Sequence, residues 1–120
     1  MKKPNFDFEY GDCAALAVVL HRETGRPLFA VLDFDLDLLQ IVLVHAYIKI
    51  ENKKFQIFDI CGPSNLQSIL DKYPNTEDAR EVSIDERNLL EIAYLPSNMP
   101  NIDEVIPFAR ELIAKWPKEF

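Results

Sequence analysis

Apolar residues occupy every position from 14 to 20, an unbroken run that is typical of a helix buried on most of its sides. Asp12 stands just before this run and is the expected N-cap. Gly25 is the expected left-handed stop at the other end, and Pro27 prevents the helix from continuing. The sequence therefore predicts a first helix from the Asp12 cap to about Thr24.

A second pattern, the period-two alternation of a β-strand, covers residues 41–50. The even positions of this segment are all apolar, whereas the odd positions include His45, Tyr47 and Lys49. This is the strongest strand prediction in the chain. His45 is expected on its mixed face.

Shorter segments surround this strand, and turn-forming residues separate them. We expect a strand from Leu28 to Asp33, an exposed acidic loop or edge from Asp33 to Asp37, a turn over Glu51 to Lys54, and a returning strand from Phe55 to Ile60 that ends before Gly62. The carboxy-terminal half is expected to hold a short helix from Ser64 or Asn65 to about Tyr73, a further strand from Arg80 to Ile84 and a helix from Asp85 to about Tyr94. A last helix, capped by Asn101, is expected to kink or restart at Pro107 and to run to about Trp116.

This order of elements predicts an α+β fold, in which the amino-terminal helix packs on an antiparallel sheet and carboxy-terminal helices cover it. We expect a single domain over residues 1–120, with a core at about 11–62 and a helical cover with one possible strand at 63–120.

Charge and composition narrow the possible partners. A net charge of −7 repels phosphate backbones, so nucleic acid is not an expected partner. The apolar stretches are too short to cross a bilayer, and we expect a soluble, cytoplasmic protein with no membrane partner. Two cysteines and two histidines supply neither a disulfide framework nor zinc-ligand spacing, so no metal or cofactor is expected. The sequence leaves the oligomeric state open.

Cys13 carries the candidate chemistry, because it opens the predicted first helix. A helix amino terminus favours the thiolate form of a cysteine through the helix dipole and the unpaired N–H groups. His45 and Asp59 follow on the two predicted strands, so the chain offers a thiol, a base and an orienting acid in that order. The alternative is that Cys13 is simply a small buried apolar residue, as most free cysteines are.

The other histidine, His21, lies eight residues after Cys13 on the same predicted helix. The helical rise alone separates the two by about 12 Å, which is beyond hydrogen-bonding range. Only His45 can therefore act as the base. For Asp59 to share a face with His45, the hairpin needs a turn of odd length, and a three-residue turn would place the two directly opposite each other.

Several fragments between residues 11 and 62 together resemble the transglutaminase-like branch of the papain-like cysteine hydrolase superfamily. They are Gly11-x-Cys13 opening a helix, Gly25-x-Pro27 before a strand, His45-Ala46-Tyr47 within an alternating strand, and Phe55-x-x-x-Asp59. The Asp12-Cys13 pair is also similar to the cell-wall amidopeptidase branch, although Ala14 and Ala15 replace the serine and glycine that usually follow the cysteine there.

The resemblance implies a papain-like or transglutaminase-like core and a Cys13, His45 and Asp59 triad that attacks an amide or acyl carbon. Tyr10 and Asp12 would then help to position the oxyanion or the substrate. The acceptor stays open: water gives peptidase, amidase or glutamine deamidase activity, and an amine gives transfer. The expected substrate is a protein, peptide or other amide, and the acidic residues 33–37 make a basic peptide or amine a candidate.

Two further questions remain open in the sequence. Cys61 shares a strand face with Asp59 and is expected to be structural, since no helix start or second histidine lies near it. The whole domain is alternatively a catalytically inactive, acidic binding or inhibitory module. The exposure of Cys13 distinguishes the hydrolase from the binding module. A catalytic Cys13 must be accessible to substrate and close to His45, whereas a binding module can leave Cys13 buried.

Overall fold

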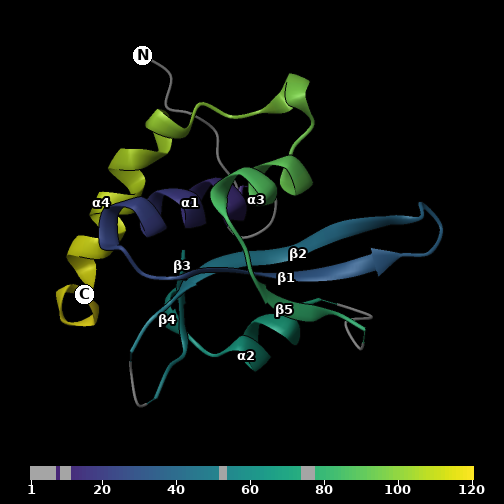
Figure 1. Ribbon diagram of the computed structural model, residues 1–120. Coiled ribbons are helices and arrows are strands. Elements are labelled where there is room, and N and C mark those ends of the chain that lie inside the picture. The colour runs from purple at the N-terminus through teal and green to yellow at the C-terminus, as the bar shows by residue number, and fades with distance from the viewer. Residues whose placement is uncertain (1–7, 9–11, 52–53, 74–77) are drawn as a thin grey trace.

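A five-stranded antiparallel sheet with helices on both faces organises the computed structural model, which describes residues 8, 12–51, 54–73 and 78–120 (Figure 1). The strand order across the sheet is β4-β3-β2-β1-β5. In chain order the elements are α1 (Cys13–Thr24), β1 (Leu28–Asp35), β2 (Gln40–Lys49), β3 (Ile57–Asp59), β4 (Gly62–Ser64), α2 (Leu66–Leu70), β5 (Arg80–Ser83), α3 (Glu86–Ala93), the 3₁₀ turns η1 (Pro96–Asn98) and η2 (Ile102–Val105), α4 (Ile106–Lys115) and the 3₁₀ turn η3 (Pro117–Glu119). The α+β class is therefore confirmed.

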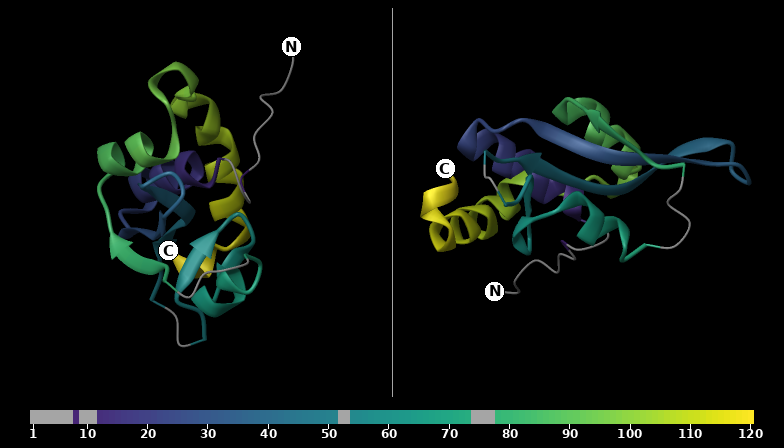
Figure 2. Two further views of the ribbon diagram at one scale, coloured as in Figure 1. Left: turned by 90° about the vertical axis from the view of Figure 1, so that its right-hand side faces the viewer. Right: turned by 90° about the horizontal axis from the view of Figure 1, so that it is seen from below.

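The first helix, α1, is the centre of the larger hydrophobic core. Every residue from 13 to 20 is buried, because the sheet covers one side of the helix while α3 and α4 cover others (Figures 1 and 2). Gly25 ends α1 in the left-handed conformation, with φ of 71°, and its N–H donates to the carbonyl of His21 at 2.9 Å. The predicted helix and its stop are confirmed.

The capping role expected of Asp12 is wrong. Asp12 precedes α1, but its side chain makes no capping hydrogen bond. Its Oδ1 instead accepts a hydrogen bond from the hydroxyl of Tyr94, just after α3, at 3.2 Å. A tertiary contact has replaced the local one.

The hairpin of β1 and β2 is longer than predicted, since β1 continues to Asp35, and it projects beyond the body of the molecule (Figure 2). Its register is interrupted between Val31 and Leu32, which lie opposite His45 and Leu43. The extra residue, Val44, is a β-bulge. Because of it Leu43 and Ala46 both pack against the α1 side of the sheet, whereas Val44 packs on the α2 side. The uninterrupted alternation expected over residues 41–50 therefore fails at this point.

The strands β2 and β3 pair with Ile48 opposite Phe58 and Lys49 opposite Ile57. The connection is two residues longer than the expected three-residue turn, since Ile50 N–H donates to the carbonyl of Gln56. Its length remains odd, so His45 and Asp59 share a face as required. They are diagonal neighbours, however, and not directly opposite each other.

The chain after β3 differs from the prediction in another way. The strand ends at Asp59, and residues 62–64 return beside it as β4. Gly62 enables this reversal, with φ of 83° and no space for a side chain: an added Cβ would come within 2.7 Å of the Trp116 ring. The short strand β4 was not anticipated.

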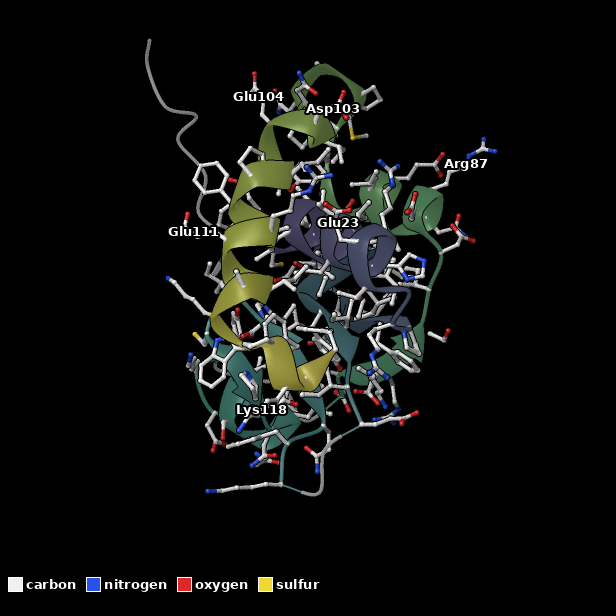
Figure 3. The ribbon with its side chains drawn as sticks, turned by 90° about the vertical axis from the view of Figure 1, so that its left-hand side faces the viewer. Glu23, Arg87, Asp103, Glu104, Glu111 and Lys118 are labelled. Carbon is white, nitrogen blue, oxygen red and sulfur yellow. The ribbon has the colours of Figure 1, made fainter. Side chains whose placement is uncertain are left out.

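The carboxy-terminal segments largely follow expectation. β5 pairs with β1 at the sheet edge, and Asp85 caps α3 by accepting the N–H of Asn88 at 2.8 Å. Asn101 accepts an N–H at the start of η2, and α4 begins afresh with Pro107 in its first turn. α4 then lies across α1 on the side of the molecule away from the hairpin (Figure 3). Among the described residues, no helix has the length and apolar character needed to cross a membrane.

Gly25 and Gly62, which are both left-handed, provide a test of this packing. Gly25→Ala adds a Cβ in open space and should cost about 1 kcal/mol, the usual penalty for a left-handed alanine. Gly62→Ala should cost about 3 kcal/mol, because overpacking against Trp116 is added to the same penalty. Urea unfolding measures both values. In a Trp116→Ala background the cost of Gly62→Ala should fall to that of Gly25→Ala, and an unchanged cost would contradict the packing against Trp116.

Candidate functional site

A buried contact between His45 and Asp59 is the centre of the candidate site. The Nε2–H of His45 donates to Oδ2 of Asp59 over 2.9 Å, and both side chains are almost completely shielded from solvent. The bulge at Val44 lies next to His45, where it redirects the side chain relative to the rest of β2. The structure therefore brings together the base and the acid that the sequence singled out.

The second carboxylate oxygen of Asp59 is also satisfied. Its Oδ1 accepts the backbone N–H of Cys61 at 2.9 Å, which fixes the chain at the reversal from β3 to β4. A buried carboxylate needs partners for its lone pairs, because an unpaired one would incur a large desolvation cost. Asp59 is thus both a partner of His45 and the organiser of the turn that follows it.

Cys13 also contacts His45, through a hydrogen bond between its side chain and the imidazole. Burial by itself would lower the pKa of His45, but the hydrogen bonds with Asp59 and Cys13, together with the electrostatic interaction of both groups with the ring, raise the pKa to about 9. The imidazole is consequently protonated at neutral pH.

Cys13 is nevertheless only 2% exposed. A catalytic thiol must meet two conditions, proximity to His45 and accessibility. The described residues meet the first condition and not the second. Tyr10, the expected oxyanion residue, lies outside the described residues, and so does Gly11.

Asp12 lies beside the thiol and is held in place from α3. The Tyr94 hydroxyl that donates to it belongs to a half-buried side chain, and burial, followed by the charge of Asp12, raises the pKa of Tyr94 above its usual range. The Asp12 carbonyl accepts the N–H of Leu16, which begins the hydrogen bonding of α1. Asp12 is therefore held in place next to Cys13.

His21 lies at the other end of α1, as the helical rise requires. Its Nδ1 is 2.6 Å from the carbonyl oxygen of Arg26, so the ring anchors the turn that follows the helix. This placement agrees with the exclusion of His21 as a base for Cys13.

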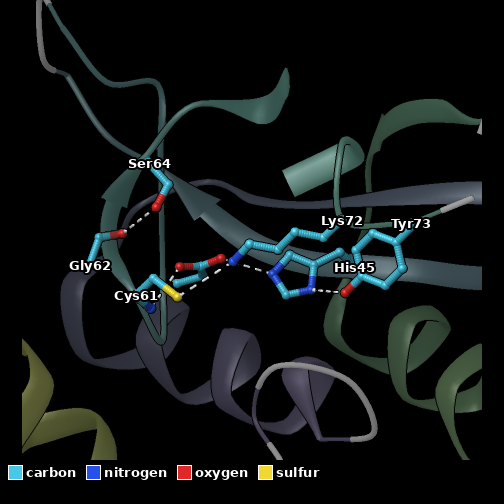
Figure 4. Close-up of polar contacts among 7 residues, drawn as sticks. His45, Cys61, Gly62, Ser64, Lys72 and Tyr73 are labelled. Atoms are coloured by element: carbon cyan, nitrogen blue, oxygen red, sulfur yellow. Dashed lines mark hydrogen bonds and ion pairs between the residues drawn. The ribbon is translucent and has the colours of Figure 1, made fainter. Parts of the chain in front are cut away.

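Residues at the end of α2 contribute to the site, and the sequence did not indicate this. The hydroxyl of Tyr73, just beyond α2, is 3.4 Å from Nδ1 of His45, and Nζ of Lys72 is 3.9 Å from Sγ of Cys61 (Figure 4). These residues and Ile69 line a small pocket together with His45 and Asp59. No sequence pattern marks Lys72 or Tyr73, because their role depends on where α2 packs against the sheet.

Cys61 is exposed, whereas Cys13 is buried. The nearby ammonium group of Lys72 is the kind of environment that favours a thiolate, so Cys61 is less isolated than its sequence context suggested. Among residues 8, 12–51, 54–73 and 78–120, no group of three His, Cys, Asp or Glu side chains is arranged to hold a metal ion. The chemistry available to the site is that of a thiol, an imidazolium and a carboxylate.

Comparison of the chain with protein-family models, with curated proteins and with solved structures finds no match.

Proposed function

We propose that this protein is a cysteine-dependent hydrolase or acyl transferase that acts on an amide bond. The observation that carries the proposal is that one imidazole, that of His45, contacts both Asp59 and Cys13. Thiolate, imidazolium and carboxylate in series are the arrangement that nucleophilic catalysis by cysteine requires. The arrangement supports the same papain-like or transglutaminase-like relationship that the sequence fragments suggest.

In this mechanism the Cys13 thiolate attacks the carbonyl carbon of the amide. The tetrahedral oxyanion is stabilised by the N–H groups at the start of α1, beginning with that of Cys13. The His45 imidazolium then gives its proton to the leaving nitrogen, while Asp59 holds the ring in place. Water or an amine completes the reaction by attacking the thioester, with His45 accepting the proton of the attacking group.

Burial of Cys13 favours a second candidate, a catalytically inactive module that binds or inhibits another protein. A buried thiol cannot meet a peptide carbonyl, so catalysis requires that Cys13 become accessible. The two candidates therefore differ in one measurable property, the reactivity of Cys13 in the folded protein.

Casein offers a direct test of catalysis, since mass spectrometry of its digests reports cleavage, glutamine deamidation and incorporation of an added amine together. We expect one of these products with the native chain and a loss of at least 1,000-fold in Cys13→Ala, the order expected when the nucleophile is removed. Cys61→Ala is the matched control and should retain activity. Equal activity in the two cysteine variants would reject Cys13 as the nucleophile.

Alkylation tests the activation of Cys13 without a known substrate. In a Cys61→Ser background, iodoacetamide should modify Cys13 at neutral pH, and His45→Gln should slow the modification by about 100-fold, the lower range for loss of a general base. His21→Gln is the matched histidine control and should leave the rate unchanged. Modification only under unfolding conditions would favour the binding module.

The stability of the fold should depend on the protonation of His45. Because its pKa is raised from 6.5 to about 9, its contribution is fully present below pH 6.5 and is lost as the pH rises through about 9. We expect the free energy of unfolding to fall by on the order of 3 kcal/mol more in the native chain than in His45→Gln between these limits. Urea unfolding across this range gives the difference, and parallel pH profiles would count against the charged site.

A further inference from the structure

Exposed apolar side chains are concentrated on the β1–β2 hairpin. Among the described residues, eight large apolar side chains are exposed, and five of them lie between positions 34 and 41: Phe34, Leu36, Leu38, Leu39 and Ile41. Leu36 and Leu39 at the turn are 78% and 76% exposed. Apolar side chains clustered in this way on a projecting segment mark an interaction site more often than scattered ones do.

The register explains how these residues form one face. Leu32 lies opposite Leu43, and both pack against the core on the α1 side. Phe34 lies opposite Ile41, two positions further along each strand, so this pair continues the same face beyond the core. The apolar surface of the sheet thus extends past the helices that cover it elsewhere (Figure 1).

A groove borders this face where the hairpin meets the end of α3. It is lined by Ile41 and Val42 from β2 and by Ala93, Tyr94 and Leu95 from the other side. An extended peptide segment can bind in this groove. Among the described strands, β3 pairs only with Ile48 and Lys49 of β2, and β5 pairs only with residues 29–32 of β1. Neither of these strands therefore pairs with the outer part of the hairpin.

Charge determines which occupant fits. Asp33 and Asp35 lie on the other face of the hairpin from Phe34 and Ile41, and their cross-strand partners are Val42 and Gln40. Asp37 is in the exposed turn. Within the described ranges, none of these carboxylates has an ion pair with a lysine or arginine. A second copy meeting tip to tip would bring two such sets of charges together on chains that each carry −7.

We propose that the β1–β2 hairpin docks an extended segment of a partner protein in which apolar residues alternate with lysine or arginine. The apolar residues cover Phe34 and Ile41, and the basic residues approach the aspartates. This inference is independent of catalysis, because it uses none of Cys13, His45 or Asp59.

Three fluorescein-labelled peptides of equal length provide the test: Val alternating with Lys, Val alternating with Glu, and Ser alternating with Lys. Fluorescence anisotropy with the full chain should give a Kd for the Val/Lys peptide at least tenfold lower than for either of the others. Equal binding of the Ser/Lys peptide would reduce the interaction to charge alone and overturn the proposal, as would equal binding of the Val/Glu peptide.

Two variants locate the site. Phe34→Ser with Ile41→Ser should weaken binding of the Val/Lys peptide at least tenfold. Asp35→Asn with Asp37→Asn should weaken it several-fold and reduce its salt dependence, while the asparagine oxygen at 35 can still accept the turn N–H groups that Asp35 accepts. Thermal unfolding should be little changed in the asparagine variant, which keeps the test valid if the serine variant fails to fold.

Matched controls complete the experiment. Glu104→Gln with Glu111→Gln removes the same charge from the side of the molecule away from the hairpin and should leave binding unchanged (Figure 3). Cys13→Ser should bind as the native chain does, which separates this proposal from the proposed catalysis. Equal loss in both charge variants would overturn the proposal. So would hairpin-dependent dimers in sedimentation equilibrium, or hairpin-dependent binding to phosphatidylcholine vesicles.

Discussion

The buried contact between His45 and Asp59 connects the fold to the chemistry. A charged pair inside a sheet is tolerated only when its remaining hydrogen-bonding groups are satisfied, and here the Cys61 N–H satisfies the second oxygen of Asp59. That bond fixes the reversal into β4, where Gly62 contacts Trp116 near the end of the chain. The same carboxylate therefore orients the imidazole and holds the turn that brings Gly62 against Trp116.

A second constraint is the all-round burial of α1. A helix that is apolar on every side needs cover from more than one element, and the sheet, α3 and α4 supply it. The arrangement gives the domain most of its core, but it also places Cys13 at a buried helix end. Stability and reactivity thus oppose each other at this residue, since the packing that holds the thiol beside His45 also limits access to it.

The hairpin shows the reverse situation. Its apolar face begins as part of the core at Leu32 and Leu43 and continues to Phe34 and Ile41, which are exposed because none of the described helices covers them. The exposed side chains of Phe34 and Ile41 add little to the core, so the stability of the domain does not explain why they are apolar. The buried site and the projecting hairpin are consequently two distinct features. Helices and the sheet bury the thiol of the first, whereas the apolar side chains of the second are exposed.

The sequence by itself determined the elements whose signals are local. The apolar run and Gly25 defined α1, Asp85 defined the start of α3, and the choice of His45 over His21 followed from the helical rise alone. Such signals are reliable because they depend on residues close together in the chain. The shared face of His45 and Asp59 was only a condition in the sequence, since it needs an odd-length connection, and the register of β2 and β3 met that condition.

Only the tertiary structure decided the rest. Asp12 exchanged a local cap for Tyr94, which is far away in sequence. A bulge at Val44 places Leu43 and Val44 on opposite sides of the sheet, against different hydrophobic clusters. Tyr73 reached His45 only through the packing of α2. Each of these outcomes depends on competition between distant segments for the same partner or space, and no short sequence pattern records the result of that competition.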